Sequence, residues 1–155
     1  MSFDPVWFMV AASVIATIGI AVLFSQSMLA IQTEMDRDPQ AASHGFVDKQ
    51  RTSFLLKAAI VESLPMILIV IGFMQGADSD TTRDTMAIIL PLVIIIGVFA
   101  ASIFGIWSAL RQALSHHDIV GQPVAQAIQA YGFLAIAFAG AIPIISVMFT
   151  LFILG

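Results

Sequence analysis

The chain has 155 residues, of which 59% are hydrophobic and only 10% are charged. So few charges cannot cover the surface of a soluble domain, and the composition therefore predicts a membrane protein. The chain has no cysteine and a formal charge of −4 without a basic patch, which excludes disulfides, thiolate metal sites and nucleic-acid binding.

Four apolar stretches follow one another along the chain and predict an all-α membrane protein. They cover approximately residues 5–31, 52–76, 86–113 and 124–154. Each is at least as long as the ~20 residues that a helix needs to cross ~30 Å of hydrocarbon. Polar connections separate the stretches, and the first connection, from Gln32 to Arg51, is the longest.

Lysine and arginine are concentrated in two of the three connections. Only Arg83 lies in the second connection, and the other basic residues lie in or beside the first and third: Arg37, Lys49, Arg51, Lys57 and Arg111. Positive residues favour the cytoplasmic side of a membrane. We therefore expect the first and third connections to be cytoplasmic and both termini to face outside.

The prolines occupy matching positions in the two halves of the chain. Pro5 and Pro91 open the first helix of each half, Pro39 and Pro123 lie in cytoplasmic connections, and the second helices contain Leu64-Pro65-Met66-Ile67 and Ile142-Pro143-Ile144-Ile145. The pattern predicts two tandem helical hairpins in the same orientation, residues 1–76 and 77–155. Aligning the inner prolines places Gly140 opposite Glu62, so the second hairpin lacks a carboxylate.

Glu62 is the one charged residue near the middle of a predicted span. A charged side chain at the centre of a bilayer costs roughly 2.5–3.5 kcal/mol on insertion scales. Because lipid disfavours the charged form, a carboxyl that faces lipid must be neutral or ion-paired. The default hypothesis is that Glu62 carries the activity by taking up and releasing a cation.

The first half resembles a known family. Its segments Arg51-Thr52-Ser53-Phe54-Leu55-Leu56 and Ile60-Val61-Glu62-Ser63-Leu64-Pro65-Met66-Ile67 resemble the second helix of ATP synthase subunit c, the proteolipid of F-type and V-type rotary ATPases. Arg37-Asp38-Pro39 stands where that family has an Arg-[Gln/Asn]-Pro turn, and Ile18-Gly19-Ile20-Ala21-Val22-Leu23 resembles part of its glycine-rich first helix. The second half matches only through the internal repeat.

The resemblance implies a subunit of a homo-oligomeric or mixed ring that turns against subunit a in an energy-coupling membrane, bacterial or organellar. Glu62 would carry the ion, with Ser63 beside it bonded either to Glu62 or to the preceding turn. Pro65 would bend the helix and free a backbone carbonyl, although a simple packing kink is an equal alternative. The turn formed by Arg37, Asp38 and Pro39 would touch the central stalk. The chain would need no cofactor and catalyse no covalent reaction, because ATP chemistry would belong to partner subunits.

Three departures from the family bear on this interpretation. Asp38 replaces the expected amide, the first helix has only Gly19, and extra residues follow Pro39. One carboxylate in four helices resembles the V-type arrangement, whereas the local motif resembles the F-type. The type of complex therefore stays open.

The transported ion is predicted to be a proton. Val61-Glu62-Ser63 matches sodium-type relatives, which also place a glutamine on the first helix. That position falls at Ile20 when aligned through Gly19 and at Phe24 when aligned through the connection, and Gln26 fits neither alignment. Sodium requires several oxygen ligands, which an aliphatic or aromatic side chain does not supply.

Two other classes of function stay open. The chain could be a small four-helix transporter or scaffold in which Glu62 pairs with Lys57 or Arg111, although Lys57 is poorly spaced for a tight pair. It could also be an assembly factor whose carboxylate only specifies helix partners. His116 and His117, and the acidic connection around Asp80, are interpreted as solvated, so no metal site is predicted.

Overall fold

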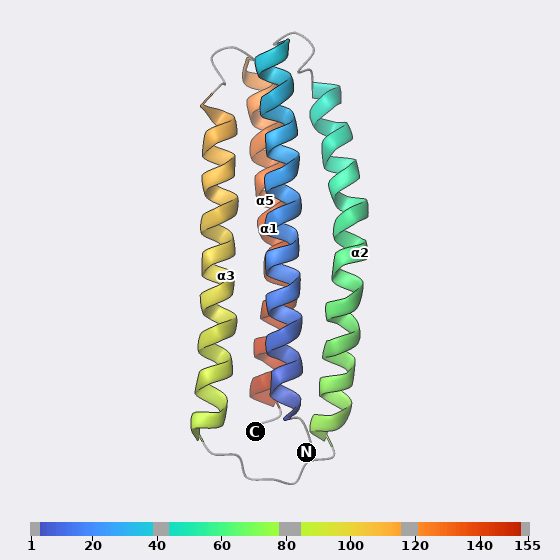
Figure 1. The fold of residues 1–155 in the computed structure, drawn as a ribbon, viewed down its shortest axis with the longest axis vertical. Coiled ribbons are helices and arrows are strands. Elements are labelled where there is room, and N and C mark those ends of the chain that lie inside the picture. The colour runs from blue at the N-terminus through green and yellow to red at the C-terminus, as the bar shows by residue number, and fades with distance from the viewer. Residues whose placement is uncertain (1–3, 39–43, 78–84, 116–120, 153–155) are drawn as a thin grey trace.

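The computed structural model describes residues 4–38, 44–77, 85–115 and 121–152. These residues form four long α-helices and no strand: α1 (Pro5–Arg37), α2 (His44–Ala77), α3 (Thr85–Leu114) and α5 (Gln122–Phe152). Figure 1 shows the helices side by side in one elongated bundle, with the start of α1 and the end of α5 at the same end. All four are long and apolar enough to cross a membrane, which makes the chain a multi-pass membrane protein.

The predicted spans were correct in number and order, but two of their ends were wrong. α1 continues beyond residue 31 to Arg37, and α2 begins at His44 rather than at residue 52. Extending an existing helix adds a backbone hydrogen bond for each residue and needs no apolar surroundings, so helices do not stop where hydrophobicity stops. The first connection is consequently much shorter than its polar sequence suggests.

The prolines that open the two halves occupy different helical positions. Pro5 stands in the first turn of α1, where Asp4 caps the helix by accepting a hydrogen bond from the Val6 N–H at 3.1 Å. Pro91 instead lies inside α3, because that helix already begins at Thr85. The prediction that Pro91 opens its helix is therefore wrong, and its ring stands where it removes one helical hydrogen bond.

α1 and α5 form the centre of the bundle. Each of them packs against all three other helices, and α2 and α3 lie on opposite sides of this central pair (Figure 1). α2 and α3 consequently leave much of their apolar surface uncovered, including Ile60, Ile67, Val93 and Phe104. In a membrane this surface faces lipid or another protein.

Three aromatic rings pack together in the bundle interior, toward the Arg37 end of α1. Phe24, Phe54 and Tyr131 come from α1, α2 and α5, and each is at most 1% exposed. Tyr131 lies edge-on to both phenylalanines, with ring centroids 5.2 Å from Phe24 and 5.3 Å from Phe54. We call these three residues the aromatic cluster.

The Ser102 hydroxyl joins α3 to α1 by a hydrogen bond. The Ser102 Oγ donates a hydrogen bond to the Thr17 carbonyl at 3.1 Å, and both residues are buried. We expect Ser102→Ala to lower the free energy of unfolding by about 0.5–1.5 kcal/mol, the range for hydrogen bonds between membrane helices. Unfolding in detergent would measure the loss. The exposed Ser108 on the same helix is the control, and an equal effect of Ser108→Ala would contradict the prediction.

Candidate functional site around Glu62

Glu62 lies near the middle of α2, inside the span from Gly45 to Gly76. Its side chain is partly buried, and its Oε1 atom is fully buried without a hydrogen-bond partner among the described residues. A charged oxygen in that position would be strongly destabilised unless a proton or a cation accompanied it. The geometry therefore suits a carboxyl group that binds a cation.

Helical spacing places Glu62 along the seam between α2 and α5. Phe73 is eleven residues further on, about three turns, and so it lies on the same side of α2. Phe73 contacts Phe149 of α5 with ring centroids 4.9 Å apart, and toward the start of α2 Phe54 contacts Phe138 of α5 at 6.3 Å. Glu62 is thus placed between two aromatic contacts that join the same two helices.

Gly19 brings α1 close to α2 beside this carboxylate. A Cβ atom at Gly19 would lie only 2.5 Å from the Cγ1 atom of Val61, the residue before Glu62. A larger residue at this position would therefore require the Val61 side chain to move or the two helices to separate. Sequence reasoning noted Gly19 as part of a family pattern and missed its contact with Val61, for which the one glycine of α1 was the available signal.

Ser63 forms a hydrogen bond within its own helix, and Pro65 lies inside that helix without ending it. The Ser63 hydroxyl is exposed and donates to the Ile60 carbonyl at 2.7 Å, so it bonds to the preceding turn rather than to Glu62. α2 continues without a break through Pro65 to Ala77. Because proline has no N–H, the Val61 carbonyl loses its usual helical donor, and this freed carbonyl directly precedes Glu62.

The residues expected to contact a stalk lie at the opposite end of α1 from Asp4. Arg37 is the last residue of the helix, and the Asp38 N–H caps it by donating to the Glu34 carbonyl at 2.9 Å. Both side chains are exposed. Pro39 lies outside the described residues. The structure does not bring this turn together with Glu62, which stands far down α2.

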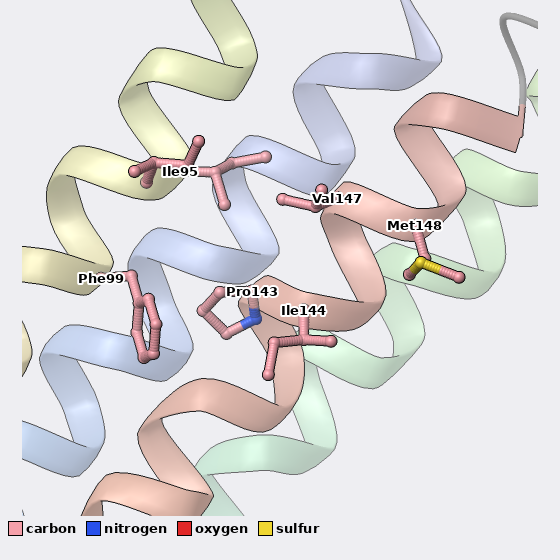
Figure 2. A pocket seen from close by; sticks show the side chains of 7 residues that line it. Ile95, Phe99, Pro143, Ile144, Val147 and Met148 are labelled. Atoms are coloured by element: carbon pink, nitrogen blue, oxygen red, sulfur yellow. The ribbon is translucent and has the colours of Figure 1, made fainter.

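An aromatic ring lies against Gly140, the residue that the proline alignment places opposite Glu62. A Cβ atom at Gly140 would lie 3.2 Å from the Phe99 ring of α3. Figure 2 shows Phe99 beside Pro143 and Ile144, in a pocket lined only by apolar side chains: Ile95, Ile96, Phe99, Pro143, Ile144, Val147 and Met148. This location offers an ion neither charge nor a side-chain oxygen. The sequence alone gave no signal for the contact between the Phe99 ring and Gly140.

The first helix provides no side-chain amide at Glu62. Ile20 and Phe24, the two positions where sodium-type relatives would carry glutamine, are both fully buried hydrophobic residues. Gln26 is exposed and lines a groove between α1 and α3, away from the seam that holds Glu62. Backbone carbonyls and Glu62 itself are therefore the oxygen atoms most available to an ion here.

The basic residues weighed as partners for Glu62 lie elsewhere. The Arg111 guanidinium stands over the Trp107 ring, 5.5 Å from its centroid, and the Lys57 side chain is exposed. Arg51 forms an ion pair with Asp48 at 3.0 Å. Within the described ranges no group of three or more histidine or acidic residues could hold a metal ion, and His116, His117 and Asp80 lie outside those ranges.

Comparisons of the chain with protein-family models, curated proteins and solved structures found no match. Glu62 and its surroundings are therefore the observations that bear on function.

Proposed function

We propose that this chain is an ion-translocating subunit of a membrane ring, of the kind represented by subunit c of the rotary ATPases, and that Glu62 carries the transported proton. The observation that supports this proposal most is the buried Oε1 atom of Glu62, which has no hydrogen-bond partner among the described residues and lies near the middle of a helix long and apolar enough to span a membrane. Carboxylates in such positions are expensive and typically mark ion pathways.

The proposed mechanism uses the change in solvation around one carboxyl group. Facing lipid, Glu62 is neutral because desolvation disfavours its charged form. In an aqueous half-channel of a stator, subunit a in this proposal, it releases its proton and is held there as the anion. Moving one elementary charge across 100 mV is worth ~2.3 kcal/mol, so several such steps can drive rotation.

The arrangement of the helices fits this assignment. We propose that α1 with α2 and α3 with α5 form two tandem hairpins, that several copies form a ring, and that both termini face outside. The exposed turn at Arg37 and Asp38 would then meet a central stalk, whose partner subunits perform the ATP chemistry. The membrane would be an energy-coupling one, with lipid covering the outer surface of the ring.

Protons are preferred over sodium because the side chains near Glu62 are poor sodium ligands. The fully buried Ile20 and Phe24 supply no oxygen, and the Ser63 oxygen is turned to its own helix. A proton needs only the carboxyl group.

Dicyclohexylcarbodiimide tests the proposal, because it reacts with protonated carboxyl groups in apolar surroundings. We expect it to modify Glu62 selectively and to stop ion flow in membranes that contain the assembled complex. Mass spectrometry of the labelled chain identifies the site. Modification elsewhere with ion flow intact would reject the assignment. If sodium ions protected Glu62 from the reagent, the transported ion would be sodium instead of the proton.

The size of the particle in detergent separates a ring from a small transporter or scaffold. A ring subunit runs as one large homomeric or mixed species, whereas a transporter of this length runs as a monomer or dimer. A monomeric particle that still transported ions would contradict the proposal that the chain forms a ring.

A further inference from the structure

A groove runs along the outside of the bundle between α1 and α3. The part nearer the middle of the bundle has a volume of about 510 Å³, the part nearer the end of α1 has about 450 Å³, and Ser25 lines both. Phe24 of the aromatic cluster is buried, so Ser25 and Gln26, which follow it at steps of ~100°, turn outward to the groove. No atom lies within 4 Å of a Cβ placed at Gly105, which also lines the groove, so space is open there.

Two exposed tryptophans mark the depth of this groove in a membrane. Trp7 of α1 is 39% exposed and Trp107 of α3 is 42% exposed. α1 and α3 run in the same direction (Figure 1), and Ser25 and Leu29 line the groove together with Ser108. Trp107 therefore stands near the level of residue 27 on α1, ~30 Å from Trp7. Tryptophans gather at the two interfaces of a membrane, whose hydrocarbon is ~30 Å thick, so Trp107 marks the interface nearer the end of α1.

The part of the groove nearer the middle of the bundle is mainly apolar. Five apolar side chains line it: Ile18, Ala21, Val22, Val98 and Ala101. Ser102 also lines it, but its hydroxyl is bonded to the Thr17 carbonyl, and Ser25 and Gln26 lie at the end nearest Trp107. Ile18 stands ~14 Å from the level of Trp107, which is about half of the ~30 Å of hydrocarbon. This part therefore has the length of one leaflet.

α1 and α3 pack together beyond this part of the groove. Ile95 of α3 is 1% exposed and belongs to the same buried cluster as Ala12 and Ala16 of α1. A membrane-spanning helix of another protein crosses both leaflets and would need a groove along ~20 residues to bury its length. A lipid molecule occupies one leaflet, so the extent of the groove favours a lipid.

The part of the groove at and beyond the level of Trp107 carries polar side chains. Three of them line it: Gln32, Ser108 and Gln112. Arg111 lies seven residues from Phe104, about two turns, and Phe104 lines the groove, so the exposed Arg111 stands at its rim above the Trp107 ring. Guanidinium groups bind phosphate oxygens strongly, and amides and hydroxyls donate to them as well. The groove is thus apolar within the hydrocarbon and suited to phosphate at the interface.

We propose that this groove binds one phospholipid molecule, with an acyl chain along its apolar part and the phosphate group beside Arg111. Asp36 lies four residues beyond Gln32 on the same face of α1, so the rim is not purely positive. Recognition is therefore of the phosphate group, which every phospholipid carries, and not of additional negative charge. The groove lies away from the seam that holds Glu62, and the lipid site does not rest on the proposed function.

Native mass spectrometry of the chain in detergent tests the site. Phosphatidylglycerol is added at increasing concentration, and the spectra count the lipid molecules retained by each chain. Diacylglycerol with the same acyl chains is the matched ligand, because it lacks only the headgroup with its phosphate. We expect one tightly retained phosphatidylglycerol per chain and about tenfold weaker retention of diacylglycerol, since the contact with a charged group is lost. Equal retention of the two lipids would overturn recognition of phosphate.

Two pairs of variants locate the bound lipid. Arg111→Gln removes the charge and Ala101→Leu fills the apolar part, and each should weaken retention of phosphatidylglycerol about tenfold. Lys57→Gln and Ala59→Leu are the matched controls on α2, on the other side of the central helices, and should leave retention unchanged (Figure 1). All four side chains are exposed, so the bundle interior stays intact. Equal effects of the variants and their controls would show that lipid binds anywhere on the apolar surface and would reject the site.

A second copy of the chain in the groove would give a different spectrum. Oligomers would then retain no lipid that depends on Arg111, and the lipid site would be rejected. That result would leave the expected effect of Glu62→Gln on ion flow unchanged, so the two proposals fail separately.

Discussion

Glu62→Gln is expected to reduce ion flow through the assembled complex to the background level while leaving the size of the complex unchanged. Glutamine keeps nearly the same shape, so the seam between α2 and α5 is preserved. It cannot bind and release a proton, and the other acidic residues of the four helices, Glu34, Asp36 and Asp48, lie close to the helix ends. Proton flux into vesicles, driven by a membrane potential, measures the loss.

Two matched substitutions separate the chemistry of Glu62 from general damage. Glu34→Gln removes a carboxylate near the end of α1, outside the apolar part of the helix, and is expected to leave ion flow unchanged. Ser63→Ala removes the neighbouring hydroxyl, which bonds only to the preceding turn, and should change ion flow by less than about twofold, because this local bond contributes little. If Glu62→Gln retained ion flow comparable with these controls, the carboxyl group would not be the carrier.

Gly19→Ala is expected to lower the free energy of unfolding by about 1–3 kcal/mol, the usual cost of overpacking. Helix propensity alone predicts the opposite sign, since alanine is favoured over glycine by about 1 kcal/mol inside a helix. The new Cβ atom would lie 2.5 Å from Val61 Cγ1, and the β-branched Val61 has little rotamer freedom in a helix, so the clash outweighs the propensity. Unfolding in detergent measures the difference.

Gly105→Ala provides the control for Gly19→Ala, because Gly105 follows Pro91 by the interval at which Gly19 follows Pro5. No atom lies within 4 Å of a Cβ placed at Gly105, so this substitution should be neutral or stabilising for the isolated chain. Val61→Ala should relieve the clash and restore most of the stability lost in Gly19→Ala. If Gly19→Ala and Gly105→Ala behaved alike, the close approach of α1 to α2 would be disproved.

The sequence predicted the number of helices correctly because that number depends on a local property. The length of an apolar run decides whether a helix can cross a membrane. The ends of α1 and α2 were misplaced because a helix extends past its apolar part wherever backbone hydrogen bonds can continue. The end of an apolar run marks where the chain leaves the hydrocarbon, which need not be the residue at which the helix ends.

The sequence by itself determined that the chain has four apolar stretches long enough to cross a membrane as helices, and that a carboxylate, Glu62, lies within one of them. The tertiary structure alone decided that Val61 fills the space beside Gly19, that the Phe99 ring lies beside Gly140, and that Oε1 of Glu62 has no hydrogen-bond partner in the part of the chain that the structure describes. These contacts join residues distant in the chain. They depend on how the helices rotate and approach one another, which the spacing of apolar residues in one helix does not specify.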